Sequence, residues 1–185
     1  MNVSKKTLVM ISGLIMLFAG VLGLILCLLP AISTAFADSD SVWSVAFSTD
    51  PDAYGNGSSV LLLGIAALLG GIGGGVLQFL VGTGKIPAVP KKVQSLSQEE
   101  KKKKIFAGFL LGGVTLSLFY IVAAVLFFCT KRLLGFNETV YKVGAGSIGA
   151  GVVCVILALL GVCAEYFGYL YRLDVINNEA NQANE

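Results

Sequence analysis

The sequence predicts an all-α integral membrane protein, a four-helix transmembrane bundle with one short β-strand in its first outer loop. Of its 185 residues, 56% are hydrophobic and only 13% are charged, whereas a soluble domain carries about 25% charged residues. The chain also contains four charge-free apolar stretches, and most of its 23 glycines lie in them. Too few polar residues remain to cover a soluble fold, and the hydrophobic content excludes intrinsic disorder.

The four apolar stretches are long enough to cross a bilayer, which requires about 20 apolar residues in a helix. They cover about residues 7–29, 59–81, 105–130 and 143–164. The first stretch ends at Pro30, which cannot continue a helix interior. We therefore expect residues 1–172 to form one four-span membrane domain. The segments outside the spans are an outer loop at 31–57, a cytoplasmic loop at 82–104 and a polar cytoplasmic tail at 173–185.

The distribution of Lys and Arg sets the orientation of the spans, because these residues gather on the cytoplasmic side. Ten of the 13 lie in the N-terminal segment, the 82–104 loop and the region after the fourth span, and the 31–57 loop has none. The sequence thus predicts a multi-pass protein of the plasma membrane with both termini in the cytoplasm. Ala35-Phe36-Ala37 is also typical of a signal cleavage site, but the 23-residue apolar run before it favours a retained helix.

The first outer loop contains the predicted strand. Trp43, Val45 and Phe47 alternate with small residues, and a period of two with aromatic and β-branched residues is typical of a strand with one apolar face. That face must be covered. The residues either sit among the aromatic side chains of the membrane interface or contact a partner protein.

The cytoplasmic loop ends in a helix start and a basic cluster. Ser97 followed by Glu100 matches a capping box, so we expect the third helix to begin near Gln98. The next four residues, Lys101, Lys102, Lys103 and Lys104, ring that helix where it enters the membrane. Such a cluster anchors the topology, and it also attracts anionic lipid.

Glycines mark the faces of the helices at which two backbones can approach closely, the small-xxx-small pattern of membrane proteins. The glycines that we select as candidate helix-packing or partner-contact residues are Gly64, Gly71, Gly75, Gly108, Gly112 and Gly149. Three interpretations stay open: packing inside the bundle, a face for another subunit, and a pliable helix that lines a pore.

Catalytic chemistry has little support in this sequence. It contains no histidine, which removes the commonest general base and metal ligand. Gln78 and Glu165 form a candidate polar site near the inner ends of their spans, and we expect Glu165 to be a solvated charge at a helix end. No base, nucleophile and oxyanion donor converge, so the sequence predicts a protein that is not an enzyme, with no catalytic residue, metal or cofactor.

Several motif-like patterns do not support a site. Gly144, Gly146 and Gly149 match G-x-G-x-x-G, but they lie inside a span and follow no strand. The outer aspartates Asp38, Asp40, Asp50 and Asp52 do not have EF-hand spacing. All four cysteines lie within spans, where apolar packing is expected, although a bridge between Cys27 and Cys129 is geometrically conceivable. The small net charge of +2 argues against a nucleic-acid partner.

These observations predict association as the function. The preferred hypothesis is a small subunit or scaffold of a membrane protein assembly, formed with other subunits or with copies of itself, and the alternative is an oligomeric channel or a transporter of ions or small solutes. A lipid-sensing regulator that acts through the lysine cluster is a third hypothesis. The plan of four spans with a larger first outer loop is similar to that of claudin-type tetraspans. The claudin Gly-Leu-Trp signature and outer-loop cysteine pair are missing, so no functional residue is carried over.

Overall fold

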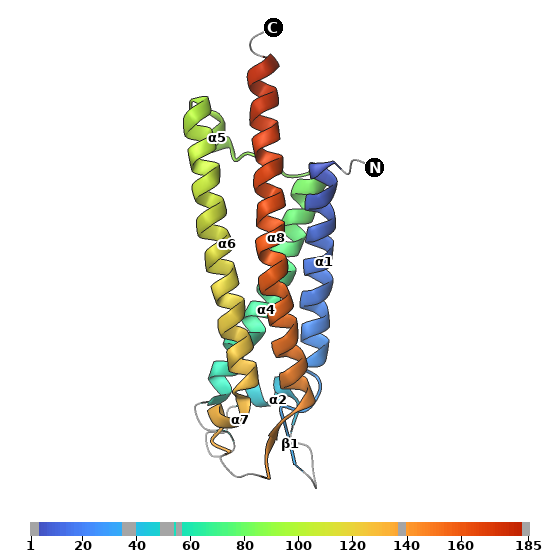
Figure 1. Ribbon diagram of the computed structural model, residues 1–185. Coiled ribbons are helices and arrows are strands. Elements are labelled where there is room, and N and C mark those ends of the chain that lie inside the picture. The colour runs from blue at the N-terminus through green and yellow to red at the C-terminus, as the bar shows by residue number, and fades with distance from the viewer. Residues whose placement is uncertain (1–3, 35–39, 49–53, 55–56, 137–139, 183–185) are drawn as a thin grey trace. The chain divides into compact units, whose positions relative to one another are not determined.

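The computed structural model describes residues 4–34, 40–48, 54, 57–136 and 140–182 (Figure 1). Within these residues, four helices are long and apolar enough to cross a membrane. They are α1 (Lys5–Leu26), α4 (Gly57–Thr83), α6 (Gln98–Phe128) and α8 (Ala145–Gln182). The chain therefore has the helices of a multi-pass membrane protein, as its sequence predicts. The Ala35-Phe36-Ala37 segment and Asp38, Asp50 and Asp52 lie outside the described residues.

The predicted capping box at the start of α6 is confirmed. The backbone N–H of Glu100 donates to the hydroxyl of Ser97 at 3.4 Å, and the N–H of Ser97 donates to the Glu100 carboxylate at 3.2 Å. This reciprocal pair satisfies two backbone donors that a helix start leaves without an intrahelical partner. The helix accordingly begins at Gln98, and the four lysines occupy its first turns.

Helix α8 is the main departure from the predicted elements. The sequence predicts a span that ends near residue 164 and a polar tail after residue 172, but the helix continues to Gln182. Side chains of this extension have partners in the same unit of the structure. Ile176 is fully buried with Val89 and Ile105, and Asp174 accepts from the ammonium of Lys5 at 2.7 Å. Because these contacts stabilise the helical conformation, the polar composition of this segment does not end the helix.

Internal contacts divide the chain into two compact units. The first unit comprises Met1–Leu17, Gly73–Ser117 and Leu159–Glu185, and the second comprises Phe18–Ile72 and Leu118–Ala158. Both ends of the chain and ten of the 13 Lys and Arg residues belong to the first unit. The first unit also contains the short helix α5 (Lys91–Gln94).

Close contact between α1 and α4 organises part of the first unit. A Cβ atom built on Gly75 would lie 2.6 Å from the carbonyl oxygen of Gly13 and 2.6 Å from the backbone nitrogen of Leu17. A Cβ on Gly82 would lie equally close to the backbone of Met10. The two backbones touch without intervening side chains, which is the purpose of small residues in membrane helices.

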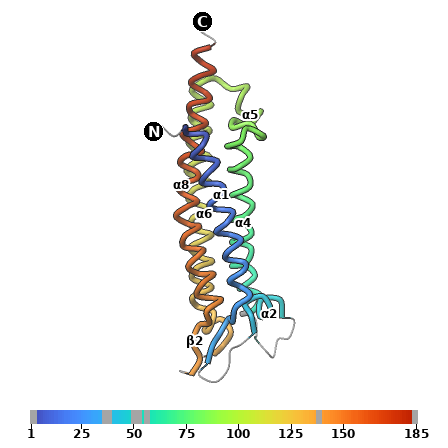
Figure 2. Tube along the Cα trace, turned by 90° about the vertical axis from the view of Figure 1, so that its right-hand side faces the viewer, coloured from blue at the N-terminus to red at the C-terminus, as the bar shows by residue number. Residues whose placement is uncertain are grey.

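Among its described residues, the second unit contains a small sheet and two short helices. Strand β1 (Ile32–Ser33) pairs antiparallel with β2 (Lys142–Val143), with Ile32 opposite Val143. Figure 2 shows β2 and the short helix α2 (Val42–Ala46) at the same end of this unit. The other short helix, α7 (Thr130–Leu133), follows α6 directly. The hydroxyl of Ser147 at the start of α8 donates to the carbonyl of Ala31 at 3.0 Å.

The strand predicted at Trp43–Phe47 is wrong, because this segment forms α2. The strand of the first outer loop lies instead at Ile32–Ser33. Ser41 caps α2 by accepting from the N–H of Ser44 at 3.2 Å, and Val42, Val45 and Ala46 are buried. Burial at positions i, i+3 and i+4 is the pattern of a helix with one buried face. In this short segment the helix buries these three side chains, although the alternation of apolar and small residues predicts a strand.

Candidate functional site

A polar cluster in the first unit joins α4 and α8. The side-chain amide of Gln78 on α4 donates to one carboxylate oxygen of Glu165 on α8 at 3.4 Å. The guanidinium of Arg172, two turns further along α8, lies 3.9 Å from the other oxygen. Gln78 is only 7% exposed, and the side chains of Glu165 and Arg172 are 18% and 24% exposed. The structure thus brings together the two residues of the predicted polar site and adds a cation that the prediction omitted.

Glu165 does not lie at the end of a helix, which corrects the sequence-based expectation. It lies within the 38-residue α8, and its side chain is next to Gly112 and Gly113 of α6. Gly112 follows Lys104 by eight residues, which corresponds to about 12 Å along a helix. Glu165 thus lies beside a part of α6 that is about 12 Å from the last lysine of the basic cluster.

Three glycines border this cluster. A Cβ on Gly112 or Gly113 would be 4.0 or 3.9 Å from Glu165, and one on Gly168 would be 3.5 Å from the amide of Gln78. Gly113 and Gly168 are not among the residues selected from the sequence. The position of Gly168, three residues after Glu165, is the only signal that could have suggested it.

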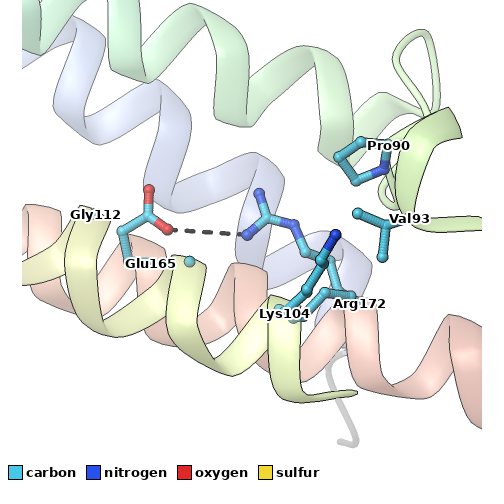
Figure 3. A pocket seen from close by; sticks show the side chains of 8 residues that line it. Pro90, Val93, Lys104, Gly112, Glu165 and Arg172 are labelled. Carbon is cyan, nitrogen blue, oxygen red and sulfur yellow. Dashed lines mark ion pairs between the residues drawn. The ribbon is translucent and has the colours of Figure 1, made fainter. Parts of the chain in front are cut away.

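A cavity of about 300 Å³ adjoins Glu165 and Arg172. Its lining residues come from α6, α8 and the segment around α5: Pro90, Val93, Lys104, Ile105, Gly108, Gly112, Glu165 and Arg172. Figure 3 shows the guanidinium of Arg172 directed toward Glu165, with Pro90, Val93 and Lys104 around the same pocket. The Nε atom of Arg172 also donates to the carbonyl of Ala88 at 3.2 Å, which holds the side chain in position.

The four lysines of the basic cluster differ in their surroundings. Lys101 is buried and its ammonium lies 3.3 Å from the carboxylate of Glu179. Lys102, Lys103 and Lys104 are exposed, and of the four only Lys104 lines the cavity. Lys101 therefore stabilises the C-terminal part of α8, and Lys104 lines the cavity. Lys102 and Lys103 are exposed and do not line the cavity.

Most of the selected glycines lie at contacts inside the chain. A Cβ on Gly64 would be 2.6 Å from the ring of Phe127, one on Gly71 would be 2.9 Å from Leu157, and one on Gly149 would be 3.1 Å from Leu26. Gly75 contacts the backbone of α1, as described above. Gly108 is different, because nothing lies within 4 Å of its added Cβ. Gly13 and Gly82, which the sequence analysis did not select, make backbone contacts as close as those of Gly75.

The outer-loop residues are divided between core and surface. The indole N–H of Trp43 donates to the carbonyl of Leu24 at 3.1 Å, and Val45 is buried. Phe47 is 58% exposed and stacks on Trp43 with ring centroids 5.5 Å apart. Of these three candidate contact residues, Phe47 is the one available to another molecule. All four cysteines are free thiols, so the structure contains no Cys27–Cys129 bridge.

Comparison with protein-family models, curated proteins and solved structures gives no match to this chain. The class of the protein consequently follows from its own helices, which are those of a multi-pass membrane protein.

Proposed function

We propose that this chain is a non-enzymatic four-helix bundle of the plasma membrane that acts as a small subunit or scaffold of a membrane protein assembly. Both termini and the lysine-rich segment face the cytoplasm in this proposal. The positive-inside rule supports the orientation, because the unit that contains both termini also carries ten of the 13 basic residues.

The open position at Gly108 on α6 carries the proposal. Glycine in a helix costs up to about 1 kcal/mol relative to alanine. At Gly64, Gly71 and Gly75, close contacts within the chain compensate for that cost. Gly108 has no such contact, and a second helix that approaches α6 would provide one.

The surroundings of Gly108 fit a helix-packing face. On the face of α6 that carries Gly108, Leu111 lies one turn further along and is 70% exposed. In its most apolar window, α6 has 22% of its residues buried, compared with 50% in α8. Helix α6 therefore has the most surface left for a partner, either a different subunit or a second copy of the chain.

A matched pair of glycine variants tests this proposal. We expect Gly108→Leu to remove co-purifying subunits, or to lower the native mass, when the protein is extracted in a mild detergent. Gly73→Leu is the control, because Gly73 on α4 also has nothing within 4 Å of its added Cβ. At neither position does an added Cβ meet another atom within 4 Å. A monomeric wild-type protein without partners, or equal effects of the two variants, would contradict the proposal.

An oligomeric channel or transporter is the second candidate, and the cluster of Gln78, Glu165 and Arg172 beside the cavity favours it. Four helices leave little room for a pathway, so several copies would have to surround it. We expect reconstituted vesicles to release trapped K⁺ or a small fluorescent anion, and Glu165→Gln to change the rate. Glu99→Gln, which alters an exposed carboxylate, is the control. If the vesicles retain both solutes, the protein is neither a channel nor a transporter for K⁺ or for this anion.

A further inference from the structure

The charges around the cavity beside Glu165 are not balanced. Lys104 and Arg172 contribute two positive charges and Glu165 contributes one negative charge. Glu165 lies 3.9 Å from the guanidinium, which is beyond hydrogen-bond distance. Among the described residues, the ammonium of Lys104 has no ion-pair partner. A net positive cavity with unused N–H donors is suited to an anion.

Two lysines in the described part of this unit have the ion-pair partner that Lys104 lacks there. Lys5 lies 2.7 Å from Asp174, and Lys101 lies 3.3 Å from Glu179. Each of these ammonium groups has a carboxylate from α8 as its partner. Lys104 instead lines the cavity together with Arg172, and the one carboxylate among the lining residues, Glu165, lies 3.9 Å from the guanidinium of Arg172.

The remaining lining of the cavity is apolar or lacks side chains. Pro90, Val93 and Ile105 form its apolar part, and Gly108 and Gly112 leave the surface of α6 bare. These positions extend over about 12 Å of helix from Lys104 toward the apolar centre of α6. The cavity is thus cationic beside the basic cluster, and the one carboxylate among its lining residues, Glu165, lies next to Gly112. In the orientation proposed above, the cationic end lies where anionic headgroups of the inner leaflet gather around the lysine cluster.

We propose that this cavity binds the phosphate group of an anionic lipid from the inner leaflet, with Lys104 and Arg172 as its cationic contacts. The volume of about 300 Å³ corresponds to about ten water molecules, which is enough for a phosphate and a few attached carbon atoms. This inference uses the orientation proposed above but does not require an assembly partner.

Lipid binding to the purified protein in a non-ionic detergent tests the proposal, with dioleoyl phosphatidylglycerol as the probe and native mass spectrometry as the readout. We expect Lys104→Gln to weaken binding about fivefold, since a lysine near an anionic surface contributes about 1 kcal/mol. The control is Lys102→Gln, which removes the same charge two residues before Lys104 at a position outside the cavity lining. It should weaken binding less than about twofold. Arg172→Lys, which retains the charge but loses the guanidinium geometry, should also weaken it.

Two further measurements separate the sources of the phosphate and check folding. Phosphatidylglycerol should raise the thermal unfolding midpoint of the wild-type protein more than that of Lys104→Gln. Without lipid, the midpoint of this variant should equal that of the wild type. Inorganic phosphate should neither bind nor compete at equal concentration. Equal losses in Lys102→Gln and Lys104→Gln would overturn the specific site. Tight binding of inorganic phosphate that depends on Lys104 would show that the ligand is a free phosphate and not a lipid.

Discussion

The amide of Gln78 on α4 donates to the carboxylate of Glu165 on α8 at 3.4 Å, although 87 positions separate these residues in the sequence. The contact links two apolar helices through their polar side chains, next to a cation on the second helix. The geometry makes Glu165 the acceptor on which the whole cluster depends. Changes at this residue are therefore the first test of the structure.

Glu165→Gln should destabilise the protein, because it removes the negative charge beside the partly buried guanidinium of Arg172. We expect a loss of about 1–3 kcal/mol in the free energy of unfolding, measured by chemical or thermal unfolding in detergent. In the Arg172→Gln background the same substitution should cost less, because the charge pair is already absent. Additive losses in the double variant would show that the two charges do not interact.

Gly75→Leu should destabilise the contact between α1 and α4. A side chain at this position meets the backbone of Gly13 and Leu17, and overpacking of this kind costs about 1–3 kcal/mol or more. Gly73→Leu, only two residues away but open, should leave the thermal unfolding midpoint unchanged. The prediction fails if the two variants unfold at the same temperature.

Ile176→Ala should loosen the C-terminal extension of α8. Ile176 is fully buried with Val89 and Ile105, and truncation of a buried isoleucine costs about 2–5 kcal/mol. Hydrogen exchange of the backbone amides after residue 172 should accelerate, whereas the exposed Asn178→Ala should have no such effect. Unchanged exchange in the Ile176 variant would indicate that the extension is stable without this cluster.

The pKa of Tyr54 provides a prediction for alkaline pH. Burial raises the pKa of this phenol above its ordinary value of 10.0, and its hydrogen bond to the carboxylate of Asp40 raises it further. The folded state therefore retains the proton more tightly than the unfolded state. The resulting stabilisation is fully present below the ordinary value and is lost as the pH rises through the raised pKa.

Tyrosinate absorbance checks this prediction. The difference between the titrations of the wild-type protein and Tyr54→Phe gives the titration of Tyr54 alone. We expect it to lie above the ordinary tyrosine pKa, and Asp40→Asn should shift it down because the negative charge is removed. A Tyr54 titration at the ordinary value would show that the hydrogen bond of 2.8 Å does not persist in solution.

The sequence predicted the features that depend on local chemistry. Apolar length gave the four spans, and the spacing of Ser97 and Glu100 gave the start of α6. The strand at Trp43 was wrong because five residues contain too few periods to distinguish alternation from a helical turn. The extent of α8 was missed because it depends on contacts of Ile176 and Asp174 with residues far away in the sequence.

The candidate site could be predicted only in part. Gln78 and Glu165 were recognised because polar residues are rare in these spans. Their contact and the role of Arg172 depend on how α4 and α8 align, which composition does not determine. The same limit applies to glycines: the sequence located them, but only the structure separated Gly108, which faces open space, from Gly75, which touches another backbone.

The length of α8 has a consequence for spectroscopy. Its 38 residues correspond to about 57 Å of continuous helix, so its last turns keep a fixed rotation and distance relative to Glu165. A spin label or fluorophore at the exposed Asn181 would move together with the helix as a rigid body. Small tilts near the polar cluster would appear there as displacements several times larger, and binding at the cavity could be followed without a label near it.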